Sequence, residues 1–388
     1  MRLIRYLICA LALAFCLVFL VSCSPGRGYE AALVLADIAA RDKPSRLKST
    51  TPAPFRETVA FTIEGRHYQG DLYRPGTEPR SALLLVPGAA EAGKDDPRLV
   101  AFATTLARAR FTVLVPDLAS LRQLRVNPGN VAEIRDAFAW LVTTKGLAPA
   151  QRGGMVAFSY AAGPAILAAL DPQIRERTGF ILAVGGYHDL PQVLTFFTTG
   201  WFRHEGKWRH LDPNEYGKWV FVRSNLGRLD DPVDRALLEA MARRKISDLS
   251  ASLDDLAQHL RPQGKALYAF ISNSDPQRGP ELQLLLPEGI RADIAALDLA
   301  SRDLSPLVAR LLLIHGYDDS IIPFAESIAL TSALPPGQAR LFLVNGLAHV
   351  DLEPGLRSRF RLWRAIYHLL LERDAYCETQ PENKRPAR

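Results

Sequence analysis

Apolar runs and amphipathic stretches alternate along the chain from about residue 57 onward. Short continuous apolar runs are typical of strands that a sheet buries on both faces, whereas apolar residues spaced three or four apart indicate helices. Runs of the first kind occupy residues 82–86, 111–115, 155–158 and 180–184. Helical patterns lie between them, at residues 97–106, 130–141 and 161–170. This alternation predicts a mostly parallel sheet with helices on both faces.

The flanks of this pattern predict further core elements. Residues 58–63 and 68–73, joined through Gly65, have the pattern of two antiparallel strands. Asn130 followed by Glu133 predicts a capping box at the start of its helix. Strands at 311–314 and 341–344 and a helix at 360–371 then complete the core.

The alternation stops after residue 186 and resumes at residue 311. Residues 190–305 look mostly helical, with Asp231 and Ser252 as helix caps, which predicts a largely helical cap inserted over the carboxyl ends of the strands. The early part of the insertion is rich in aromatic residues, and these favour a cap core over a lipid-binding groove. They are Phe196, Phe197, Trp201, Phe202, Trp208, Tyr216, Trp219 and Phe221.

The first 23 residues have the pattern of an export signal. Arg2 and Arg5 precede an apolar run over residues 6–21, which is shorter than the roughly 20 residues that a spanning helix needs. The segment Leu20-Val21-Ser22-Cys23 resembles the lipobox of bacterial lipoproteins, which implies cleavage of residues 1–22 and lipidation of Cys23. Ser24 implies the outer membrane by the same resemblance. An ordinary cleaved signal and an uncleaved anchor are the alternatives.

Composition and charge limit the partners of the chain. Its 388 residues allow one large domain with an insertion, and its formal net charge of +6 gives no support for nucleic-acid binding. Cys9 and Cys16 lie in the signal and Cys377 lies in a polar tail, so we expect no intrachain disulfide. The predicted parts are a linker with a short helix (23–56), core segments (57–189 and 306–375) around the cap (190–305), and the tail (376–388).

Ser159 directly follows the strand at 155–158 and precedes a helix. A serine there would lie on a sharp strand-to-helix turn, exposed above the edge of the sheet. The turn brings two backbones close together, so the residues two before and two after must be small, and they are Ala157 and Ala161. Ser159 is therefore a candidate nucleophile.

Two other candidate residues follow later strands. The segment His315-Gly316-Tyr317-Asp318-Asp319, after one strand, and His349, after the last, complete the chain order Ser, Asp, His. In these features the chain resembles the α/β-hydrolase superfamily over about residues 57–189 and 306–372. The resemblance implies a triad of Ser159, Asp319 and His349, with Asp318 or Asp189 as alternative acids. Alanine replaces the glycines that usually flank the serine.

Such a triad would perform acyl transfer. His349, oriented by Asp319, would take the proton of Ser159, and the resulting oxyanion would need preorganised donors. The backbone N–H groups of Ala89 and Tyr160 are the candidates. We therefore expect hydrolysis of a carboxylic ester, with amide or peptide cleavage next, on a small-molecule substrate and without a cofactor or metal.

Two other functions compete with this hypothesis. Residues 88–95 follow a strand and nearly match a phosphate-binding P-loop, but Asp95 replaces the Ser or Thr that would bind Mg²⁺. The second competing function is that of a non-catalytic surface binding module on a hydrolase scaffold, since fold does not imply activity. His188 is a further candidate for lining a substrate pocket.

Overall fold

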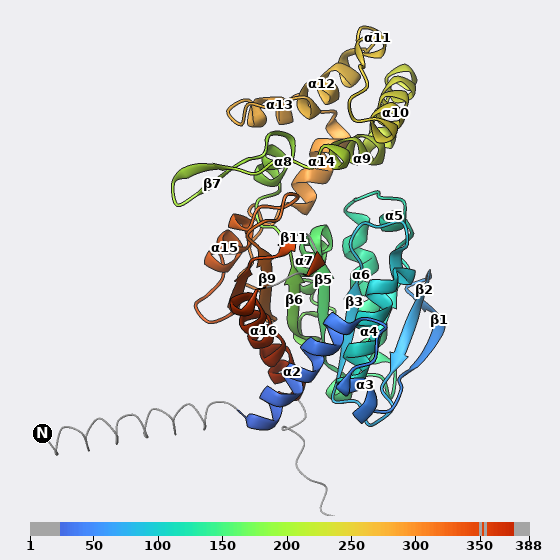
Figure 1. Cartoon of the computed structure of the whole chain (residues 1–388). Coiled ribbons are helices and arrows are strands. Elements are labelled where there is room, and N and C mark those ends of the chain that lie inside the picture. The colour runs from blue at the N-terminus through green and yellow to red at the C-terminus, as the bar shows by residue number, and fades with distance from the viewer. Residues whose placement is uncertain (1–23, 349–350, 353–354, 376–388) are drawn as a thin grey trace, which may run out of the picture.

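An eight-stranded sheet forms the centre of the protein, in the order β1-β2-β4-β3-β5-β6-β9-β10 (Figure 1). The computed structural model describes residues 24–348, 351–352 and 355–375. Strands β3 to β6, β9 and β10 pair in parallel, while β1 and β2 add an antiparallel edge, as predicted. The strands of this sheet are β1 (Phe55–Ile63), β2 (Arg66–Arg74), β3 (Ser81–Val86), β4 (Phe111–Pro116), β5 (Gly153–Phe158), β6 (Thr178–Val184), β9 (Arg310–Gly316) and β10 (Ala339–Val344).

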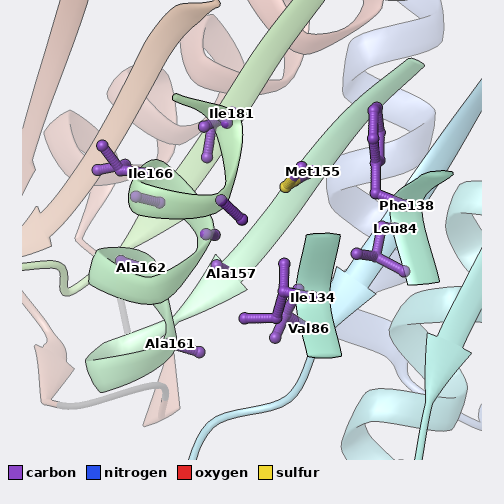
Figure 2. Packing of buried hydrophobic residues seen from close by; sticks show 14 of the residues in the cluster. Leu84, Val86, Ile134, Phe138, Met155, Ala157, Ala161, Ala162, Ile166 and Ile181 are labelled. Carbon is purple, nitrogen blue, oxygen red and sulfur yellow. The ribbon is translucent and has the colours of Figure 1, made fainter. Parts of the chain in front are cut away.

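Helices cover both faces of this sheet. On one face, α6 and α7 pack on alternate strand residues; Figure 2 shows Leu84 and Met155 among them, beside Ile134 and Phe138 of α6. On the other face, α2, α4 and α16 pack on the residues between, because strand side chains alternate in direction. The core helices are α2 (Pro25–Ala40), α3 (Arg46–Thr50), α4 (Pro97–Arg108), α5 (Ala119–Arg122), α6 (Gly129–Thr143), α7 (Ala162–Ala169), α15 (Ala325–Ser332) and α16 (Leu356–Asp374).

A helical cap is inserted between β6 and β9 and has its own apolar core (Figure 1). It also contains a hairpin, β7 (Trp201–His204) and β8 (Lys207–His210), that the helical pattern did not predict. Glu205 and Gly206 both have positive φ at its turn, the conformation that tight hairpins need. The cap helices are α8 (Leu190–Thr199), α9 (Glu215–Asn225), α10 (Pro232–Ser247), α11 (Asp254–Ala257), α12 (Pro262–Ile271), α13 (Gly279–Leu284) and α14 (Glu288–Leu297).

Two of the predicted helix caps differ from the structure, and one is confirmed. Asn130 lies inside α6, which begins one residue earlier, and its buried side chain bonds Ser120 and Glu133 instead of opening the helix. Ser252 accepts the N–H of Asp254, but the helix there spans only four residues. Asp231 does cap α10, where it accepts the N–H groups of Val233 and Asp234.

The segment expected as a linker is largely helical and packed on the core. Buried Asp37 of α2 accepts hydrogen bonds from Lys48 at 2.7 Å and from Thr105 of α4 at 2.6 Å. Fully buried Arg373 of α16 pairs with Glu30 of α2. These contacts dock α2 against α4 and α16. None of the helices in the described ranges has the length and apolarity required to cross a membrane.

Candidate active site

Ser159 lies at the turn between β5 and α7, where the short 3₁₀ helix η3 (Ser159–Ala161) begins. Its φ of 54° places it in the left-handed region, which a non-glycine residue occupies at a cost of about 1–3 kcal/mol. Ala157 and Ala161 on either side are fully buried. The sharp turn predicted for this serine is therefore present, and it holds the side chain at the carboxyl end of β5.

Close packing around this turn explains why small residues surround it. A Cβ added to Gly163 would come within 2.1 Å of the Tyr187 hydroxyl, and one added to Gly186 within 2.8 Å of Ala162. A Cβ at Gly88 would lie 3.9 Å from that of Ser159. The loop after β3, which includes Ala89, thus passes beside the serine.

Asp319 lies on the loop after β9 and is buried. Its Oδ1 accepts the backbone N–H groups of Ile321 at 2.9 Å and Ile322 at 3.0 Å. Its Oδ2 faces Gly185, the residue after β6, where an added Cβ would lie 3.2 Å away. Asp318 beside it is exposed. Of the two neighbouring acids, Asp319 is the one that points into the protein at the strand ends.

A buried histidine that sequence reasoning had not singled out supports this loop. His315, the penultimate residue of β9, contacts Ser327 through Nδ1 at 2.7 Å and the Ile322 carbonyl through Nε2 at 2.9 Å. Its Nε2 is also 3.5 Å from Oδ2 of Asp319. With both ring nitrogens bonded, His315 fixes the loop. The His-Gly at the strand end was the signal that could have revealed it.

His349 lies outside the described residues, and so does Cys23. The chain leading to His349 is described: β11 (Leu347–Ala348) pairs with β12 (Asp351–Leu352). The carbonyl of Leu347 lies 2.2 Å from where a Cβ on Gly316 would be, so this segment runs against the end of β9. The segment with Leu347 therefore lies at the same edge of the sheet as Asp319, where the parallel strands end.

A cavity of about 880 Å³ opens at Ser159, within the range of small-molecule sites. Tyr160 and the loop residues Gly88 and Ala89 line it beside the serine, and α8, α9 and α14 of the cap line it from above. Most of its lining is apolar. The cavity thus connects the turn at Ser159 with both the cap and the core.

The cap aromatics divide between several environments. Phe196 and Phe202 pack with Phe324, the residue before α15, in a small cluster, and Trp219 lies in the cap core. Phe197 and Phe221 instead line the cavity. Trp208 and Tyr216 are exposed. Core packing therefore accounts for some of these rings, and two contribute to the cavity wall.

Asp189 and His188 take part in a structural junction. Asp189 caps α8 by accepting the N–H of Gln192 at 2.9 Å. The backbone N–H groups of both residues donate to Glu326 of α15. Burial raises the pKa of Glu326 to about 7 and lowers the pKa of His188. His188 does not line the cavity, so the structure gives it no contact with this site.

The P-loop-like segment has a different structure from a phosphate cradle. Residues Gly93–Asp95 form a 3₁₀ helix, η1, and Lys94 contacts Asp71 at 3.2 Å and Asp95 at 3.0 Å. Lys94 thus pairs with carboxylates, whereas the lysine of a P-loop contacts phosphates. Nor do the described parts of the chain contain a group of three or more metal-ligating side chains.

Comparisons with known proteins bear on the fold. No family model matches the sequence, and no curated protein matches it. A solved structure from Legionella pneumophila, named as a hydrolase, superposes with a TM-score of 0.53 at 10% identity, covering 91% of this chain and 96% of its own. A dienelactone hydrolase from Anabaena variabilis has a TM-score of 0.43 at 14% identity, covering 82% of this chain and 98% of its own.

An esterase domain from a Rhodothermus marinus protein has a TM-score of 0.41 at 12% identity, covering 82% of this chain and 97% of its own. Identities this low show similarity of fold, and the L. pneumophila structure carries that similarity. Together with the strand order and the turn at Ser159, it shows that this chain has the α/β-hydrolase fold.

Proposed function

We propose that this protein is a serine hydrolase that cleaves a carboxylic ester, or a related acyl bond, through an acyl-enzyme on Ser159. The strained turn at Ser159, open to an apolar cavity, is the observation that carries the proposal. His349 acts as the general base and Asp319 orients it. The N–H groups of Ala89 and Tyr160 bind the oxyanion.

The contacts of Asp319 favour this role. Two backbone N–H groups bind one carboxylate oxygen, and the other lies 3.5 Å from Nε2 of His315 and close to Gly185. These contacts hold the carboxylate in place, as a group that orients an imidazole must be held.

A labelling experiment tests the nucleophile. The protein will react with a fluorophosphonate probe, and Ser159→Ala will abolish labelling and hydrolysis of p-nitrophenyl acetate. Ser224→Ala is the matched control, because Ser224 lines the same cavity. Labelling that persists in Ser159→Ala would reject Ser159 as the nucleophile. A wild-type protein that is not labelled would favour the non-catalytic surface binding module.

The neighbouring acids provide a second matched pair. Asp319→Asn will lower kcat by about 10³–10⁴-fold, because the imidazole loses its orienting charge. Asp318→Asn, at the exposed position, will change kcat less than threefold. Equal losses in the two variants would contradict the assignment of Asp319.

We also propose that the protein is exported and anchored through lipidated Cys23, on the strength of the segment 20–23. Cys23→Ser will move the protein from the membrane fraction to the soluble fraction and abolish incorporation of labelled palmitate. The anchor would be contradicted if Cys23→Ser fractionated like the wild type and the wild type incorporated no palmitate.

A further inference from the structure

The lining of the cavity at Ser159 extends beyond the cap to residues of α2, α4 and α16, and we call this part of the cavity the α2 arm. This arm enters the apolar layer between the sheet and helices α2, α4 and α16. Leu35 and Ile38 of α2 line it, with Phe102 of α4 opposite and Ile366 of α16 beside them. Leu35 and Ile38 are three residues apart, so they share one face of their helix.

This apolar layer is incompletely filled. Leu35, Ile38, Phe102, Phe158 and Val184 pack against the buried cluster on this face but are themselves only partly buried, and all five line the cavity. Protein interiors normally pack without voids, and unfilled apolar space lowers stability. A space of this kind, continuous with a candidate nucleophile, is suited to an apolar part of a substrate.

The two arms differ in chemistry. Under the cap most lining residues are apolar, but Asn214, Asn225 and Asp293 add polar groups deep in the wall, and Arg228 pairs with Asp293 at 2.6 Å. The walls of the other arm are apolar until it reaches charged residues of both signs where α2 ends and α4 begins. These residues are Arg41, Asp42, Lys43, Asp96 and Arg98. The two halves of an ester would therefore meet different surroundings on either side of Ser159.

We propose that the α2 arm binds the acyl chain of a medium- or long-chain ester, while the polar alcohol part lies under the cap. The proposal rests on the hydrolase function given above. Helix α2 thereby becomes a wall of the substrate site as well as a covering of the sheet. The buried contacts of Asp37 and Arg373 hold this wall in place.

Kinetics on p-nitrophenyl esters of two to twelve carbons test the arm. In the wild type kcat/KM will rise with chain length, by up to about fourfold per methylene. Ile38→Trp fills the arm and will lower kcat/KM for the decanoate at least tenfold, with the acetate within twofold. Ala36→Trp, at an exposed position of the same helix, will leave both unchanged. Phe102→Ala will shift the preferred chain to longer esters.

Binding of dodecanoate to Ser159→Ala, measured by calorimetry, gives a readout without catalysis. Adding Ile38→Trp will weaken this binding at least tenfold, and adding Ala36→Trp will not. If acetate is hydrolysed but chain length has no effect and dodecanoate does not bind, the acyl arm is overturned and the hydrolase function stands. If dodecanoate binds in the α2 arm but no ester is cleaved, the hydrolase function fails and the arm stands as a fatty-acid site.

Discussion

At the scale of single residues, the turn at Ser159 stores strain that helical packing alone would not require. Its φ of 54° accompanies a position on the cavity wall, while Ala157 and Ala161, two residues to either side, stay buried. An L-residue with a side chain is disfavoured in this conformation, whereas glycine is not. Function and stability should therefore conflict at this position.

Substitutions at Ser159 will reveal this conflict. Ser159→Gly will be more stable than Ser159→Ala by about 1 kcal/mol, because glycine removes the left-handed strain that alanine retains. Urea unfolding of the two variants measures the difference. At Ala165 in the middle of α7 the order should reverse, with Ala165→Gly less stable than wild type. An alanine variant more stable than the glycine variant at residue 159 would show that the strain is negligible.

At the scale of elements, α15 binds the loop that joins β6 to the cap through hydrogen bonds. Glu326 of α15 accepts the N–H groups of His188 at 3.0 Å and Asp189 at 2.7 Å. On the other side of this loop, Asp298 accepts the N–H of Leu190 at 3.0 Å. The start of the cap is thus fixed by two carboxylates from different segments.

The contact of Glu326 with this loop predicts that the stability of the folded protein depends on pH. Burial, together with the nearby carboxylates of Asp189 and Asp298, raises the pKa of Glu326 to about 7, against about 4.5 in an unfolded chain. The folded state therefore binds the proton of Glu326 more tightly than the unfolded chain does. The stability that this proton contributes is fully present below about pH 4.5 and is lost as pH rises to about 7.

Glu326→Gln will remove this dependence while keeping an acceptor for both N–H groups. The wild type will lose about 3 kcal/mol relative to the variant between pH 4.5 and pH 7. Chemical denaturation at half-unit pH steps measures it, with the exposed Glu281→Gln as control. Parallel profiles for wild type and Glu326→Gln would contradict the raised pKa.

At the scale of the whole molecule, the N-terminal segment is part of the folded unit. Arg373 is fully buried and pairs with Glu30 and Asp374, and it also donates to the carbonyl of Ala109 at 2.7 Å. The backbone N–H of Ser24 donates to the Tyr367 hydroxyl at 3.2 Å. Helix α2 therefore depends on α16 for its position, although more than 300 residues separate them.

Breaking this contact will loosen α2. Glu30→Gln leaves a buried guanidinium with less compensation and will lower the free energy of unfolding by about 2 kcal/mol. Asp255→Asn, which breaks the exposed pair with Arg244 at the surface of the cap, will cost less than about 1 kcal/mol. Hydrogen exchange will show faster opening of α2 in the first variant only, and unchanged protection there would contradict the docking role of Arg373.

The sequence by itself determined the order of strands and helices, the inserted cap and the turn that presents Ser159. These follow from local periodicity and from residue size at neighbouring positions, which a linear chain records directly. Asp319 could be chosen over Asp318 only through a family resemblance, and this choice stays a prediction. The structure buries Asp319 and exposes Asp318.

The tertiary structure alone decided the features that depend on distant segments meeting. The docking of α2 on α16 and the second arm of the cavity both join residues far apart in the chain. The burial of Asn130 inside α6 is of the same kind, because its partner Ser120 precedes the helix. Local patterns cannot specify such contacts, since their energy comes from packing and charge pairing that exist only after the chain has folded.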